Sequence, residues 1–568
     1  MTARTLQEAL SLLLTLPLLI VCCFAPGFFF VRRLHWNPME KLCGSVGLSL
    51  ILLYLATWGF YWFAPSVEVT AFYGLSVICT ALAILCVKDI FRLVRSFRVR
   101  HALFGFGFLW LWTFVILSMI RSYSGAGWGL DWLEHYQRAL FFLYHFPVNT
   151  PIVSNYAVSS RPPMMNMLAT FFLAQTGGRF ESFEVVFDFL NLLVFLPCCL
   201  IMPALCGPRK LRVLALTALF ALNPYVIEAA TYTWTKSLPA FFVVLAFWFY
   251  LAGWRKNDLG RMIAAFVALS AGLLVHYSAG PYCAFIGLHY MFCVFWKRER
   301  KWREFAIIAV ACSLLLFTWF SWSIATYGAH DTFASNSTIQ SSQIYPGSNL
   351  HKMVANIYDT IVPRIVRDRS AVHAWDQPYR PAVIRDNAFI FYQTNVIFEM
   401  GLIGGPLALW LLYGAFRRSH GRASERHFWM ATIPFCIILG IAVVGERDYW
   451  GVAHYTLYTL VALGITLLAG SLPLPRWAGI ALFFGCIVDF TFGIFLHARV
   501  EHLENPAQRI PIPGMTYVNG VSLRPGGTIH FLGDHFANSI FGFLDAQSVL
   551  LILLFLALLW TLWKEALA

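Results

Sequence analysis

The chain has 568 residues, of which 59% are hydrophobic, 17% aromatic and only 12% charged. A soluble globular protein carries about twice that charged fraction, and apolar runs long enough to cross a bilayer, about 20 residues each, recur along almost the whole chain. The composition excludes a string of soluble domains and predicts an all-α, polytopic integral membrane protein. The net charge of +13 does not predict nucleic-acid binding, because the basic residues lie in short connections between apolar runs.

The first apolar run covers about residues 10–30, with Arg4 as the single basic residue ahead of it. Because it leads directly into further apolar runs, we expect a retained membrane helix and not a cleaved signal peptide. The thirteen cysteines all lie within or beside such runs. This placement predicts neither a disulfide framework nor a cysteine-based zinc site.

Basic clusters determine the predicted topology, because positive charge stays in the cytoplasm. Placing every cluster inside requires about fifteen transmembrane helices, with three large segments outside at about 121–183, 327–390 and 498–546. The short apolar stretch 164–175 is then a re-entrant or interfacial helix. The predicted parts are extra N-terminal helices (1–102), a transmembrane core (103–326), an external region (327–390) and C-terminal transmembrane helices (391–568).

The stretch 129–138 opens the first outer segment and reads GLDWLEHYQR. At helical period Asp131, Glu134, His135 and Arg138 share one face, while Trp132 and its apolar neighbours take the other. A short helix of this kind suits the membrane–water boundary. The first two of these residues are also the single pair of carboxylates between Ile120 and Glu181.

Several short motifs follow in a fixed order. Asp131 is followed by RPPMMN (161–166), GPRK (207–210), ALNP (221–224) and LVHYS (274–278). This order resembles the GT-C superfamily of membrane glycosyltransferases, especially the group of protein O-mannosyltransferases and the aminoarabinose transferase of lipid A. The resemblance covers about residues 103–300. The chain differs in having about three spans (8–88) before that region, and in having Arg161 where the family has a histidine before Pro-Pro.

The resemblance implies a polyprenyl-phosphate-sugar donor and transfer with inversion at the outer face of a bacterial inner membrane. It implies that Asp131 is the catalytic base, with Glu134 as the second member of an acidic pair that is adjacent in the family. Membrane lipids are implied partners, and the acceptor is a lipid, a glycan or a protein. The plain alternative is that Asp131 is a helix cap or a solvated residue.

Transfer also needs cations beside the departing lipid phosphate. The candidates for binding that phosphate are Arg138, Arg161, Lys236 and Arg447. Arginine suits phosphate because its planar fork donates two parallel hydrogen bonds, whereas lysine acts as a point charge. Alternatively, Arg447 pairs with Glu446 or Asp448 in its own charged turn.

Further side chains on the predicted outer face are candidates for substrate contacts, namely His135, Glu228, His276 and Tyr277. Glu134 and His135 could complete a carboxylate–imidazole site for a divalent metal ion with Asp131. They could equally form hydrogen bonds to neighbouring loops, and no cofactor is required by the sequence.

Two other classes of protein remain open. An O-antigen ligase or polymerase acts on polyprenyl-diphosphate glycans through arginine and histidine, which would give more weight to Arg447 and the segment 327–390. A lipid or sugar transporter usually has paired halves and charged helices at mid-membrane, and the sequence has no such repeat.

Overall fold

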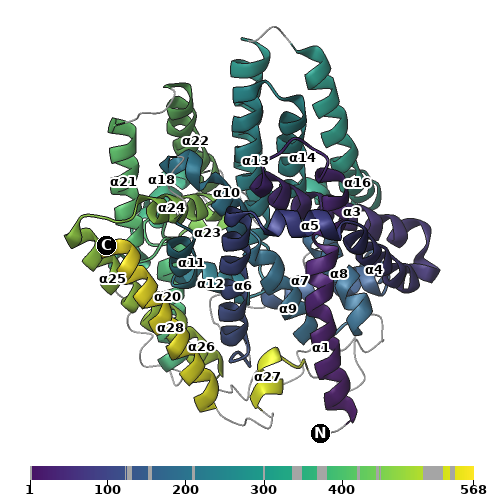
Figure 1. Ribbon diagram of the computed structural model, residues 1–568, viewed down its shortest axis with the longest axis horizontal. Coiled ribbons are helices and arrows are strands. Elements are labelled where there is room, and N and C mark those ends of the chain that lie inside the picture. Colours follow the sequence, from purple (N-terminus) through teal and green to yellow (C-terminus); the bar gives the residue numbers. More distant parts are fainter. Residues whose placement is uncertain are drawn as a thin grey trace.

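The computed structural model describes residues 3–121, 123, 131–150, 152, 157–207, 212–297, 301–334, 348–367, 380–418, 423–442, 447, 449–502, 529–537 and 544–567. Within these ranges the chain forms helices and no strand (Figure 1), as the composition predicts.

The N-terminal half contains α1 (Ala3–Cys22), α2 (Ala25–Val31), α3 (Pro38–Phe63), η1 (Pro65–Val67), α4 (Glu68–Leu85), α5 (Val87–Val94), α6 (Phe97–Leu117), α7 (Asp131–Leu143), η3 (Val158–Ser160), α8 (Met164–Thr176), α9 (Phe180–Leu192), α10 (Phe195–Cys206), α11 (Val213–Ala221), α12 (Pro224–Thr231), α13 (Ser237–Lys256), α14 (Leu259–Val275) and η4 (Tyr277–Ala279).

The C-terminal half contains α15 (Gly280–His289), η5 (Tyr290–Phe295), α16 (Trp302–Ala334), α18 (Asn349–Ile361), α19 (Arg364–Arg367), α20 (Arg380–Thr394), α21 (Gly404–Arg418), α22 (Ala423–Ala442), α23 (Ala453–Thr456), α24 (Tyr458–Ser471), α25 (Arg476–Val488), η8 (Asp489–Phe495), α26 (Leu496–His502), α27 (Leu532–Ala537) and α28 (Leu544–Leu567).

Ten helices of the described part are long and apolar enough to cross a membrane, and a bent pair would make eleven. Two shorter apolar helices, α14 and α24, add to these. The protein is therefore a multi-pass membrane protein, but the predicted number of about fifteen spans is not confirmed. The stretch 164–175 forms a helix of 13 residues, α8, which is too short to span a bilayer.

Two Asn-Pro pairs mark helix starts. At Asn37 the side chain accepts the N–H of Glu40, and the Glu40 carboxylate accepts the N–H of Asn37, which together form a capping box before α3. At Asn223 the side chain accepts the N–H of Val226, and Pro224 takes the first helical position, where its missing N–H is not needed. This second cap turns the chain by 72° between α11 and α12.

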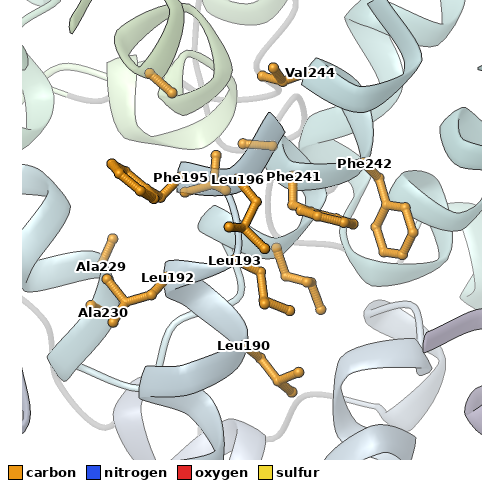
Figure 2. Packing of buried hydrophobic residues seen from close by; sticks show 14 of the residues in the cluster. Leu190, Leu192, Leu193, Phe195, Leu196, Ala229, Ala230, Phe241, Phe242 and Val244 are labelled. Atoms are coloured by element: carbon orange, nitrogen blue, oxygen red, sulfur yellow. The ribbon is translucent and has the colours of Figure 1, made fainter. Parts of the chain in front are cut away.

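The core is centred on α9 and α10, since every residue from 180 to 202 is buried. Figure 2 shows leucines of the α9–α10 segment meeting side chains of α12 and α13. By contrast, α4 exposes a row of large apolar side chains, including Tyr73, Val77 and Ile84. An exposed apolar helix face is expected where lipid is the neighbour.

The helices before residue 103 are joined to the rest of the fold. α1 packs against α8 and α9, α3 packs against α8, and α13, α14 and α16 lie side by side on another flank (Figure 1). The division of the chain into four parts stays a prediction. These contacts do bring the N-terminal helices directly against α8, the helix that follows the RPP motif.

Candidate functional site

Helix α7 carries its polar side chains on one face, as its spacing predicts, but that face is buried. Glu134 and Arg138 are each 1% exposed, and His135 is 4% exposed. Helix α8 and the segment 157–161 cover these three residues. Asp131 begins α7, and its side chain lies outside the described residues.

Glu134 holds two guanidinium groups at one carboxylate oxygen. Its Oε1 lies 2.9 Å from Nε of Arg138 and 3.3 Å from Nε of Arg161. Burial alone would favour the neutral acid, but the charges of Arg161 and Arg138 outweigh it and lower the pKa of Glu134 to about 2. Glu134 is therefore ionised throughout the physiological range and fixes Arg161 in place.

Arg138 ties α7 to the segment that carries Arg161. It donates hydrogen bonds to the carbonyl oxygens of Val158 (2.7 Å) and Ala157 (3.1 Å), and to Oγ of Ser160 (2.8 Å). Together with the bond to Glu134, these contacts occupy all three guanidinium nitrogens. Such an arrangement points to a structural part for Arg138, and its predicted phosphate contact stays a prediction.

Replacing Arg138 by methionine is expected to destabilise the protein by about 3 kcal/mol, since breaking a buried ion pair leaves polar groups uncompensated. The midpoint of thermal denaturation in lipid nanodiscs measures the loss. Arg92→Met is the matched control, because the Arg92 side chain is 80% exposed and pairs only at the surface. A midpoint for Arg138→Met equal to that of Arg92→Met would contradict the structural part.

Arg161, Lys236 and His276 meet at a single atom. Nη1 of Arg161 lies 3.2 Å, and Nζ of Lys236 3.3 Å, from Nε2 of His276. The other ring nitrogen, Nδ1, accepts the main-chain N–H of Ser278 at 3.0 Å. Three groups from three separate segments thus bring their N–H donors to one imidazole.

The imidazole of His276 cannot accept a hydrogen bond from every donor that surrounds it. A neutral imidazole accepts at one nitrogen only, and the bond from Ser278 takes Nδ1, so the ring proton belongs on Nε2. Burial, together with the charges of Lys236 and Arg161, lowers the pKa of His276 well below its usual value, which keeps the ring neutral. Nε2–H then points toward two cationic groups, and an oxyanion placed among them would accept from all three donors.

The turn that carries Lys236 is strained and firmly held. Thr233 has a φ of 59°, a region that β-branched residues rarely adopt, and its Oγ1 donates to the carbonyl of Trp132 at 3.0 Å. The Asn191 side chain donates to the carbonyl of Trp234 at 2.7 Å. Strain of this kind persists only where the surroundings over-determine the backbone, as they commonly do at functional sites.

His135 links three segments beside this turn. Its Nδ1 lies 3.2 Å from Oδ1 of Asn166, and its Nε2 lies 3.4 Å from Oγ1 of Thr235. Burial lowers the pKa of His135 to about 3, so the ring is neutral. Among the described residues no group of three or more His, Cys, Asp and Glu side chains could hold a metal ion, and the predicted metal site with Asp131 stays outside that search.

Two aromatic residues of α23 adjoin the group, and the sequence did not single them out. The ammonium of Lys236 lies 5.5 Å from the ring centre of Tyr455, a distance suited to a cation–π contact. The ring of His454 stacks on that of Trp234. Their position in the sequence could have pointed to them, because they follow the charged turn at 445–450 by only a few residues.

Arg447 lies in a different ion cluster. Its Nε is 2.9 Å from Oδ2 of the fully buried Asp359, whose other carboxylate oxygen is 2.7 Å from Nη1 of Arg367. The predicted pairing of Arg447 with Glu446 or Asp448 falls on residues outside the described part. The structure shows no hydrogen bond between Arg447 and the described residues around His276.

The remaining candidates are placed as follows. Glu228 is buried in α12. Tyr277 begins η4, directly after His276, and its hydroxyl lies 3.5 Å from the carbonyl of Thr332. Their substrate contacts stay predictions.

No protein-family model matches the chain. No curated protein matches it either. Among solved structures, the chain is similar to the crystal structure of ArnT from Cupriavidus metallidurans bound to undecaprenyl phosphate. The two chains share 13% sequence identity, the match covers 81% of this chain and 73% of that one, and the TM-score is 0.46.

Proposed function

We propose that the protein is a membrane glycosyltransferase that moves a sugar from a polyprenyl-phosphate-linked donor to an acceptor on the outer face of the membrane. The observation that supports this proposal is the meeting of Arg161 and Lys236 at Nε2 of His276. Two cationic donors beside the N–H of one imidazole suit an oxygen-rich anion such as a phosphate.

The chemistry of such a transfer explains why cations are needed there. The acceptor oxygen attacks the anomeric carbon, and the bond from that carbon to the phosphate oxygen breaks. The configuration at the anomeric carbon is thereby inverted. The donor phosphate carries one negative charge as a diester and two when it leaves as a monoester. Arg161 and Lys236 therefore stabilise the transition state more than the bound donor, which is the condition for catalysis.

Asp131 is the proposed base that takes the proton of the acceptor. A carboxylate at the start of α7 would lie one helical turn from Glu134, on the same face. Glu134 itself is held by two arginines, and its low pKa makes it a poor proton acceptor. We assign Glu134 the role of positioning Arg161. His135 is assigned the role of holding Thr235 in place through a hydrogen bond.

The direct test is a donor panel. Purified protein in lipid nanodiscs is given radiolabelled polyprenyl-phosphate sugars, one at a time, with membrane lipid extract as acceptor, and release of polyprenyl phosphate is followed. We expect one donor to be consumed, with its label recovered on a larger product.

A control panel of polyprenyl-diphosphate glycans separates the rival classes of protein. Consumption of these glycans alone would favour a ligase or polymerase. Movement of an intact lipid-linked sugar across proteoliposomes, with no chemical change, would favour a transporter and contradict the proposed function.

A further inference from the structure

Helix α18 has its polar and apolar faces reversed relative to a helix that lies in water. It comes from the segment 327–390, which the sequence predicts to lie outside the membrane. Leu350, Val354, Tyr358 and Ile361 line one face and are 43–71% exposed. They recur at intervals of three and four residues, which gives a continuous apolar stripe along the helix.

The opposite face of α18 is polar and buried. Asp359 accepts hydrogen bonds from Arg367 and Arg447, and Thr360 Oγ1 accepts the N–H of Val452 at 3.1 Å. Asn356 is fully buried on the same face. These contacts fix the rotation of the helix about its axis, so the apolar stripe is held outward. A water-facing helix shows the reverse pattern.

We propose that α18 lies in the membrane, with this stripe in contact with the acyl chains of one leaflet. The helix packs against α22, whose own outward side chains Met430 and Ile438 are apolar and about half exposed. The apolar surface of α18 thus adjoins the exposed apolar side chains of α22. A bilayer covers both surfaces without further protein.

The residues beside α18 fit the level of the lipid headgroups. The guanidinium of Arg364 stacks on the ring of Trp450, and that of Arg447 on the exposed Tyr449. Tryptophan, tyrosine and arginine are enriched where a membrane meets water. The chain segments that flank α18 have the sequences SNSTIQSSQIYPG (335–347) and, after Arg367, DRSAVHAWDQPY (368–379). Both are mostly polar and therefore poor partners for an apolar stripe.

Spin labelling tests the proposal without reference to catalysis, and so separates it from the proposed function. Cys206, Cys283, Cys293 and Cys312 are half-buried, and the other nine cysteines are buried, so the four are first replaced by alanine. A nitroxide is then attached at Leu350→Cys, Val354→Cys and Tyr358→Cys in separate proteins in lipid nanodiscs. His330→Cys is the control at a polar position, because His330 follows the break of α16 at Gly328, its side chain is 79% exposed and it pairs with Asp331.

Relaxation of the label by oxygen, which concentrates in acyl chains, is compared with relaxation by a nickel chelate, which stays in water. We expect oxygen to dominate at the three stripe positions and the nickel chelate to dominate at position 330. Dominance of nickel at the stripe would place α18 in water and overturn the proposal. Low relaxation by both reagents would mean that another protein segment covers the stripe, which would overturn it as well. All three positions are exposed, so the label itself is expected to leave the fold intact.

Discussion

Replacing Asp131 by asparagine is expected to lower kcat by a factor of about 10² to 10⁴, the range that a general base contributes. Asparagine keeps the size of the side chain and cannot take the proton of the acceptor. The donor still meets Arg161 and Lys236, so its binding is expected to change little. Single-turnover release of polyprenyl phosphate measures the rate, and equilibrium binding of labelled donor measures the affinity.

Asp331→Asn is the control for this substitution. Asp331 is a half-exposed carboxylate at the end of α16, where it pairs with His330, so its variant is expected to retain the wild-type rate. A rate for Asp131→Asn equal to that of wild type would show that another group is the base. Loss of both rate and donor binding would indicate that Asp131 supports the site and does not act on the acceptor.

Replacing Lys236 by methionine is expected to lower kcat/KM by about 10² to 10³, as the loss of one preorganised donor does at other anionic transition states. Methionine keeps most of the length of the side chain and removes the charge. The reason for so large an effect is burial, since Lys236 is only 8% exposed and its charge is poorly screened by water. Initial rates over a range of donor concentrations give the ratio.

Lys297→Met serves as the comparison, because Lys297 is an exposed residue in the turn that follows η5. Lys236→Arg provides a second comparison, since it retains the charge and is expected to recover part of the lost rate. Equal rates for Lys236→Met and Lys297→Met would remove Lys236 from the phosphate site. The binding function of Arg161 and His276 would then also be in doubt, since the three groups act at one point.

The sequence predicted local features well. The period of residues 131–138 placed Glu134, His135 and Arg138 on one helix face, where the structure has them. The ALNP motif at 221–224 coincides with the bend of 72° between α11 and α12. Both features are determined by residues that are close together in the sequence, and local sequence patterns can therefore predict them.

Long-range pairings could not be obtained in that way. Arg447 was nominated from its own turn, but its described partner is Asp359, 88 residues away. The same holds for Arg138, whose guanidinium closes on main-chain carbonyls of the segment 157–158. No side-chain pattern reveals a main-chain acceptor, because every residue carries one.

The meeting of Arg161, Lys236 and His276 was not predicted from the sequence. Arg161, Lys236 and His276 were each nominated because they occupy separate segments of the predicted outer face. Their meeting at one nitrogen depends on how η3, α13 and α14 pack, and packing lies beyond sequence periodicity. The aromatic residues of α23 were missed for the same reason.

The burial of the cationic group also determines how it responds to its surroundings. Mobile ions at 0.15 M screen charges over about 8 Å, but they do so only where water reaches the charges. Lys236 is almost completely shielded from water, and Arg161 is held against Glu134 by a contact of 3.3 Å. We therefore expect binding of an anionic headgroup at Arg161 and Lys236 to depend little on ionic strength. A headgroup bound by exposed cations would instead lose affinity as the salt concentration rises.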